Sequence, residues 1–197
     1  MVDFSQQLNF LVEIDRLKAV YRKAIVKTDN HRYENSAEHS WHVALMANVL
    51  APYADKPIDL HRVTLMLLIH DIVEIDAGDT FAFDDAAILA QQAGIEAQAA
   101  ARIFGLLPSN QRDNYLSLWR EFETAETSDA KFAKAMDRVL PLIQNMHNEG
   151  GSWAKNNVTK QQVINRNKHL ADIAPKLWAF VLEQIDIATQ NGWLRAA

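Results

Sequence analysis

The adjacent pair His70-Asp71 lies in surroundings that favour metal chemistry. It ends the apolar run from Val63 to Ile69, where a charged side chain is costly unless it is paired or bound to a metal ion. Glu74 follows four residues after His70 and three after Asp71, so all three side chains can share one helix face. Asp79 follows in the loop just beyond, which predicts a cluster of imidazole and carboxylate groups.

Two further residues could complete a metal site. His39 lies on a predicted helix three residues before His42, and Asp137 lies among apolar neighbours in a later helix. Imidazole and carboxylate together are ligands for divalent ions such as manganese, cobalt, nickel, zinc or iron. His39 alone is as compatible with a place in the core as with metal binding, so the combination carries the prediction.

Simpler interpretations stay open for each residue taken singly. His42 and His61 fit ordinary surface or half-buried positions better than metal ligands. Asp137 alone could pair with Lys134 or Arg138. Pro141 has no N–H to donate to the carbonyl of Asp137, which predicts a kink there or a helix boundary.

Helices must position these residues, because apolar residues recur at spacings of three and four and no period-two alternation is sustained. The fold class predicted is all-α, a single helical bundle. The first half is expected to contain these elements: a helix from Ser5 to Val26, a polar interruption from Thr28 to Asn35, a helix capped by Ser36 that ends before Pro52, and a helix capped by Asp59 that begins after Pro57.

The second half shows equally clear helix boundaries. We expect Gly78 to end a helix, and further helices from Ala86 to Gly105, with a weak point or break at Gly94, from Ser109 to Thr124, and from Ser128 or Asp129 to His147. A loop is expected from Asn148 to Ser152. A capping box at Thr159 should then begin a last helical segment, which Pro175 divides and Gly192 ends. With no repeat or linker in the chain, we expect one domain over residues 1–197. Its motif-bearing part spans about 8–147, and C-terminal helices at about 159–191 pack on it.

Composition narrows the classes of function. The chain has 197 residues, a formal net charge of −5 and no cysteine. The negative balance argues against binding to a nucleic-acid polymer or an anionic membrane. The lack of cysteine excludes disulfides, cysteine-based metal sites and cysteine nucleophiles. Without a signal peptide or a membrane-length apolar run, we expect a soluble cytoplasmic protein.

The pattern resembles the HD superfamily of metal-dependent phosphohydrolases. That superfamily has a His, a later His-Asp pair and a distant Asp, matched here by His39, His70-Asp71 and Asp137. The closer resemblance is to the HD-domain 5′-deoxynucleotidases. They share Glu-x-x-x-Glu-His-Ser, found at residues 34–40, and His-Asp-x-x-Glu-x-x-x-Gly-Asp, found at residues 70–79. A third similar stretch covers residues 118–137 and includes Trp119 and Phe122.

The resemblance implies a role for each matched residue. His39, His70, Asp71 and Asp137 would hold one divalent ion, with Mn, Co, Ni, Zn, Fe and Mg all open. Glu74 would orient or deprotonate the attacking water, and Asp79 would contact the sugar or assist the leaving group. The substrate-binding positions would be Arg22, which holds the phosphate, and its neighbour Lys23.

Lys23 departs from the pattern of the bacterial members, in which an aromatic residue follows the Arg and helps exclude the 2′-hydroxyl. The implied activity is hydrolysis of nucleoside 5′-monophosphates, deoxynucleotides foremost, to nucleoside and phosphate. The implied partners are a small phosphate substrate and a second copy of the chain in a homodimer.

Three alternatives stay open. One is a phosphatase of the same superfamily that acts on a non-nucleotide phosphate ester or a diphosphate. A second is a two-iron HD oxygenase, for which His42 is the nearest spare ligand. A third is a nucleotide-binding or interaction module without catalysis, which would have no need for Glu74 beside the ligand set.

Overall fold

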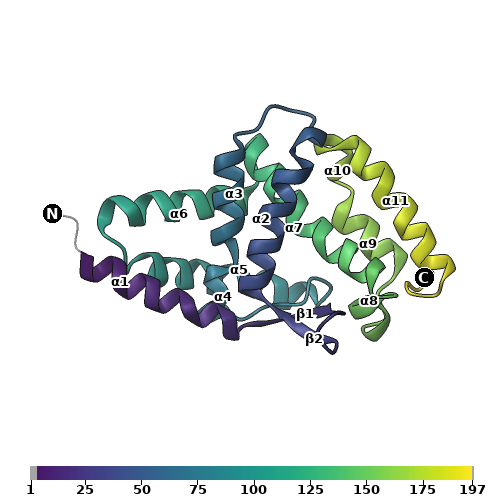
Figure 1. Ribbon diagram of the computed structural model, residues 1–197, viewed down its shortest axis with the longest axis horizontal. Helices are drawn as coiled ribbons and strands as arrows, with labels where there is room; N and C mark the ends of the chain where they lie inside the picture. Colours follow the sequence, from purple (N-terminus) through teal and green to yellow (C-terminus); the bar gives the residue numbers. More distant parts are fainter. Residues whose placement is uncertain (1–3, 197) are drawn as a thin grey trace.

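Three long helices form the centre of the molecule. A computed structural model describes residues 4–196, and in it α2 (Ser36–Leu50), α3 (Leu60–Ile69) and α7 (Ser128–His147) pack against one another (Figure 1). Fully buried apolar side chains fill the space between them, including Val43, Ala47, Val63, Met66, Ala133 and Met136. The prediction of a helical bundle is confirmed.

Two groups of helices flank this centre. On the N-terminal side lie α1 (Phe4–Glu13), α5 (Ala86–Phe104) and α6 (Ser109–Thr124). On the other side lie α8 (Gly151–Lys155), α9 (Lys160–Asn167), α10 (Leu170–Ile173) and α11 (Pro175–Gln190), and all four pack on α7 (Figure 1). Short pieces join the rest: the 3₁₀ helices η1 (Ile14–Ala19), η2 (Ala51–Tyr53) and η3 (His70–Val73), and α4 (Glu74–Ala77).

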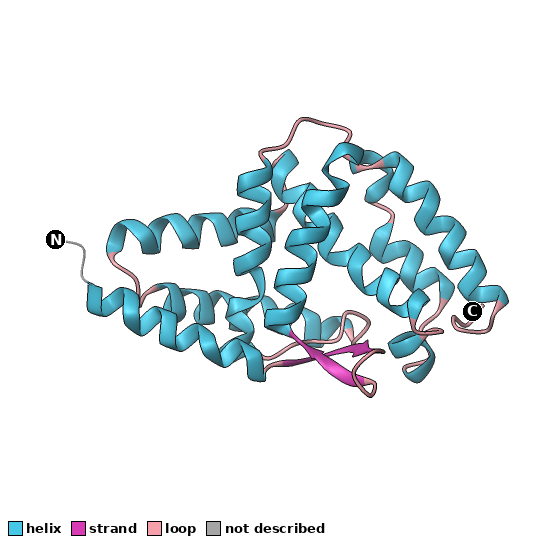
Figure 2. Cartoon of the chain, viewed as in Figure 1, coloured by secondary structure: helices cyan, strands magenta, loops and turns pink. Residues whose placement is uncertain are grey.

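A β-hairpin replaces the second part of the first predicted helix, so the expected span from Ser5 to Val26 is wrong. The strands β1 (Tyr21–Val26) and β2 (Arg32–Asn35) pair antiparallel below the helices (Figure 2). Aromatic and β-branched residues at Tyr21, Ile25 and Val26 favour a strand. Asn30 and His31 adopt positive φ angles of 49° and 57° and let the chain turn.

The helix boundaries follow local capping chemistry, with some positions shifted by one residue. Asp59 caps α3 as predicted, and Thr159 forms the predicted capping box with Gln162. Asn35 rather than Ser36 caps α2, where its side chain and Glu38 satisfy each other's backbone N–H groups. In the same way Thr127, one residue before the expected cap, accepts a hydrogen bond from the N–H of Ala130.

Four other predictions on the later helices can be compared with the structure. Gly78 ends α4 with a φ of 73°, as expected. The expected break at Gly94 is wrong, because α5 runs on through it; an exposed glycine costs a helix only about 1 kcal/mol. The helix α7 continues past Pro141 to His147 rather than ending there. The expected loop over residues 148–152 is shorter, since α8 begins at Gly151.

No helix within residues 4–196 is long and apolar enough to cross a membrane.

Two glycines provide opposite tests of this fold. At Gly94 nothing lies within 4 Å of an added Cβ, whereas at Gly150, with φ of 91°, an added Cβ would lie 2.7 Å from Cβ of Trp193. We expect Gly94→Ala to stabilise the protein by about 1 kcal/mol. Gly150→Ala should destabilise it by about 2 kcal/mol or more, because backbone strain adds to the clash. Denaturant unfolding of both variants measures the two changes; equal effects would contradict the geometry of the turn before α8.

Candidate metal centre

Ligand atoms from three separate elements meet in one place. His39 lies in the first turn of α2, His70 begins η3, and Asp137 lies in the middle of α7. One nitrogen of each His and one carboxylate oxygen of Asp137 all lie within 4.8 Å of one another. The packing of the central helices therefore brings together three of the four residues expected to bind metal, and the fourth, Asp71, lies next to them.

The His70 ring is fixed so that one nitrogen is free to bind a cation. Its Nδ1 lies 2.8 Å from the carbonyl oxygen of Leu67. A carbonyl can only accept, so Nδ1 must carry the hydrogen and Nε2 the lone pair. Trp119 donates to the carbonyl of His70 at 3.2 Å, and the Phe122 ring packs 5.0 Å from the imidazole centroid. Trp119 and Phe122 both belong to the stretch over residues 118–137 that carries the third resemblance to the family, and they hold the backbone and the ring of His70 in place.

The His39 ring is held between two carboxylates. Its Nε2 lies 3.0 Å from Oδ1 of Asp137, and its Nδ1 lies 3.3 Å from Oε2 of Glu34. Glu34 is itself buried and accepts a hydrogen bond of 2.6 Å from Gln144. A carboxylate on the outer nitrogen of a ligating His orients the ring and raises its basicity, so Glu34 is placed to support His39 as a ligand.

The donor set fits a divalent ion. His70 Nε2 is buried and makes no hydrogen bond, although Asp71 Oδ1 lies 3.0 Å away and Asp137 Oδ1 lies 3.5 Å away. Such an orphaned buried nitrogen beside two carboxylates is costly without a further partner, and a cation between them would supply one. Two imidazoles and carboxylate oxygens are the ligands that several divalent transition metals accept.

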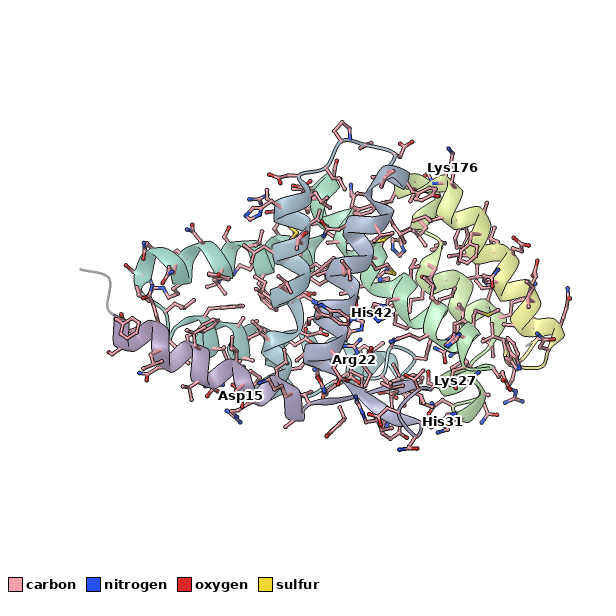
Figure 3. The ribbon with its side chains drawn as sticks, in the orientation of Figure 1. Asp15, Arg22, Lys27, His31, His42 and Lys176 are labelled. Carbon is pink, nitrogen blue, oxygen red and sulfur yellow. The ribbon has the colours of Figure 1, made fainter. Side chains whose placement is uncertain are left out.

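Asp71 connects this cluster to Arg22. Nη1 of Arg22 in β1 lies 2.6 Å from Oδ2 of Asp71. Burial alone would raise the pKa of Asp71, but the interactions with the His70 imidazole and with the positive charge of Arg22 lower it to about 2. Asp71 therefore stays ionised, as a metal ligand must. Figure 3 labels Arg22, which lies near the start of α2.

Glu74 and Asp79 approach the same nitrogen of Arg22 as Asp71 does. The Nη1 atom of Arg22 is 3.5 Å from Oε1 of Glu74 and 3.7 Å from Oδ1 of Asp79. The hydroxyl of Ser36 donates to the second oxygen of Glu74. Burial and the charge of Asp71 raise the pKa of Glu74 well above its usual range, and burial also raises the pKa of Asp79. The raised pKa values of Glu74 and Asp79 contrast with the lowered pKa of Asp71, and acids whose pKa values differ in this way suit different tasks in one site.

A narrow cleft of about 90 Å³ opens beside these groups. Arg22, Asp79 and Asp137 line it, and exposed Lys23 contributes to the lining. Its remaining walls come from the loop after α4, from α7 and from the C-terminal helices: Thr80, Phe81, Ala82, Phe83, Arg138, Pro141, Leu142, Asn145, Ser152, Trp153, Val163, Arg166 and Asn167.

The structure also separates residues that the sequence left ambiguous. His42 and His61 are exposed, as their simpler interpretation predicts, and Figure 3 labels His42 farther along α2. Three contributors were missed: Glu34 behind His39, Ser36 on Glu74, and Arg166 in the cleft. Glu34 and Ser36 belong to the motif at residues 34–40. Their contacts with His39 and Glu74 follow from the positions of β2 and the start of α2 in the fold, which the motif does not specify.

A protein-family model matches this arrangement. The HD domain model covers residues 14–178, which includes all the candidate ligands. The chain therefore belongs to the HD-domain family, as the motif indicated.

Particular relatives point to phosphohydrolases within that family. The chain is similar, at a TM-score of 0.91 and 46% identity, to a crystal structure of a predicted metal-dependent phosphohydrolase from Magnetospirillum magnetotacticum MS-1, over 97% of this chain and 95% of that one. It is 31% identical to the 5′-deoxynucleotidase HDDC2 of Homo sapiens over 70% of this chain, and it spans 65% of that protein's length. The 5′-deoxynucleotidase YfbR of Salmonella paratyphi B is 26% identical over 84% of this chain and 87% of its own length.

We expect His70→Ala to lower the affinity for divalent metal by at least about 100-fold, because it removes a ligand around which other groups are fixed. His42→Ala is the matched control, since it removes an exposed imidazole from the same region. The measurement is metal content by mass spectrometry after dialysis, with titration calorimetry for the affinity. Full metal retention in His70→Ala, or an equal loss in both variants, would contradict this site.

Proposed function

We propose that the protein is a metal-dependent phosphohydrolase that converts nucleoside 5′-monophosphates, deoxynucleotides foremost, to nucleoside and inorganic phosphate. The observation that carries this proposal is the meeting of a candidate ligand set with Arg22, Glu74 and Asp79 beside one cleft. The nucleotide part of the proposal is supported by the two 5′-deoxynucleotidase relatives.

Each residue of the candidate site has a distinct task in this reaction. His39, His70, Asp71 and Asp137 hold the divalent ion, which when bound neutralises phosphoryl charge and makes water more acidic. Arg22 lies beside this ligand set, where its guanidinium can donate to the phosphoryl oxygens. The substrate phosphorus is thereby fixed near both Glu74 and Asp79.

Glu74 is placed to act as the general base. Its carboxylate is buried, and Ser36 fixes one oxygen by a hydrogen bond. It would accept a proton as water oxygen bonds to phosphorus and the bond from phosphorus to the 5′-oxygen breaks. Asp79, at the start of the loop that covers the cleft, would give a proton to the departing 5′-oxygen or hold the sugar.

A smaller substrate is the second candidate, and the size of the cleft favours it. About 90 Å³ accommodates a phosphoryl group but is well below the 300 Å³ or more of most pockets for whole small molecules. A nucleoside would therefore require the segment from Thr80 to Phe83 to move outward. A small non-nucleotide phosphate ester would not. Lys23, in place of an aromatic residue, also leaves the choice of sugar open.

The activity is tested by phosphate release from deoxy- and ribonucleoside 5′-monophosphates and from small phosphate monoesters. We expect chelated protein to be inactive and single divalent metals to restore turnover of deoxynucleotides in the wild type but not in His70→Ala. Turnover of small esters alone would select the second candidate. A protein that holds metal and releases phosphate from none of them is not a phosphomonoesterase for these substrates.

The role of Glu74 has its own test. Glu74→Gln keeps the size of the side chain but removes the proton acceptor, so kcat should fall by about 10²- to 10⁴-fold while bound metal stays constant. Glu183→Gln, an exposed change of the same type on α11, should leave kcat unaltered. Steady-state kinetics with a metal assay on the same samples decides, and an unchanged kcat in Glu74→Gln would remove this residue from the mechanism.

A further inference from the structure

Arg166 is a guanidinium without a partner in the cleft. It lies in the last turn of α9 and lines the cleft together with Arg22, Asp79 and Asp137. Within residues 4–196 its side chain makes no hydrogen bond or ion pair, although its backbone carbonyl accepts a hydrogen bond from Arg138.

This placement is costly for a cation. Burial lowers the pKa of Arg166; the charge of Asp137 opposes this shift, and the neighbouring charges of Arg138 and Arg22 add to it. An arginine cannot escape the cost by losing its proton. A partly buried charge without a fixed partner is therefore stabilised when an anion enters the cleft.

Arg22 differs in this respect, although it lines the same cleft. Its guanidinium lies within 3.7 Å of three carboxylates, those of Asp71, Glu74 and Asp79. Its positive charge is thus already balanced within the chain. Arg166 keeps its full set of side-chain N–H donors, and their planar arrangement matches two oxygens of a phosphoryl group.

The C-terminal helices hold Arg166 in this position. The Asn145 side chain in α7 accepts hydrogen bonds from the hydroxyl of Ser152 and the N–H of Trp153, which ties α8 to α7. The capping box at Thr159 fixes the start of α9, and α9 packs on both α7 and α11. A guanidinium on such a supported helix is presented to the cleft by the fold and does not depend on a loop.

We propose that Arg166 is a substrate-binding residue that receives the phosphoryl oxygens of the phosphate ester. This inference rests on the proposed phosphohydrolase function and adds to it a second guanidinium, which comes from the C-terminal helices. With the charge of Arg22 already balanced, Arg166 supplies the positive charge that the chain leaves free for the substrate.

The test uses binding of inorganic phosphate to the full-length, metal-loaded protein by titration calorimetry, together with thermal unfolding without phosphate. In Arg166→Gln we expect phosphate affinity to fall by about 10-fold or more, the loss typical of a charged hydrogen bond. The Tm without phosphate should stay equal or rise, because a partnerless charge has been removed. Arg166→Lys should keep the charge but recover only part of the affinity, since it lacks the fork.

Arg112→Gln is the matched control, because Arg112 is exposed on α6 and pairs only with its neighbour Asp113. It should change neither phosphate affinity nor bound metal. An unchanged phosphate affinity in Arg166→Gln overturns the proposal, and so does a wild-type protein that binds no phosphate at millimolar concentration. A fall in Tm that Arg166→Lys restores without any recovery of phosphate binding assigns Arg166 a structural role instead.

Binding of phosphate is measured independently of turnover, so the two proposals can fail separately. If the wild type binds phosphate through Arg166 yet hydrolyses no ester, the proposed function fails and the anion site remains. If esters are hydrolysed and Arg166→Gln keeps the wild-type phosphate affinity and KM, the proposed function stands and the proposed role of Arg166 fails.

Discussion

The position of the Asp137 carboxylate is the constraint on which the rest of the site depends. Burial alone would raise its pKa, but the hydrogen bond from His39 and the nearby His70 imidazole hold the pKa well below its usual range, so the group is a largely buried anion. A buried anion needs partners at fixed positions. These partners come from α2 and η3, while Asp137 belongs to α7. The packing of the central helices and the geometry of the candidate metal centre therefore depend on each other. A shift of any one of these helices would leave a charged group in apolar surroundings without its partners.

Charge balance in the cleft follows from this arrangement. The carboxylates of Asp71, Glu74 and Asp79 gather around a single guanidinium, that of Arg22. The four acids Asp71, Glu74, Asp79 and Asp137 outweigh the single positive charge of Arg22, and a divalent cation on the ligand set would offset two further negative charges. The dianion of a phosphate ester then enters a region where most positive charge is already committed. Arg166, whose guanidinium forms no ion pair with a carboxylate within residues 4–196, changes that balance in favour of the incoming anion.

The sequence predicts the helical class and the clustered ligands because both depend on local spacing. Apolar residues at helical spacing mark the central helices, and the surroundings of the His70-Asp71 pair mark the site. The hairpin was not predicted because the segment from Tyr21 to Val26 is too short to show a clear period and continues the apolar spacing of the preceding helix. Glu34 and Arg166 were not predicted for a different reason, because they act through contacts between segments distant in the sequence. No spacing along the chain indicates that β2 approaches α2 or that α9 approaches the cleft.

The hairpin, which the sequence pattern did not predict, supports the candidate metal centre from both of its strands. Its first strand carries Arg22 to Asp71, and its second strand carries Glu34 to the outer nitrogen of His39. Asn35 then ends β2 and caps α2 in the same step, so the strand fixes the first turn of the helix that holds His39. Had residues 21–26 continued as a helix, the chain could not fold back on itself within this length to place both side chains. The small sheet in a helical protein thus has a structural reason: an antiparallel pair brings the Arg22 guanidinium and the Glu34 carboxylate to the same end of α2.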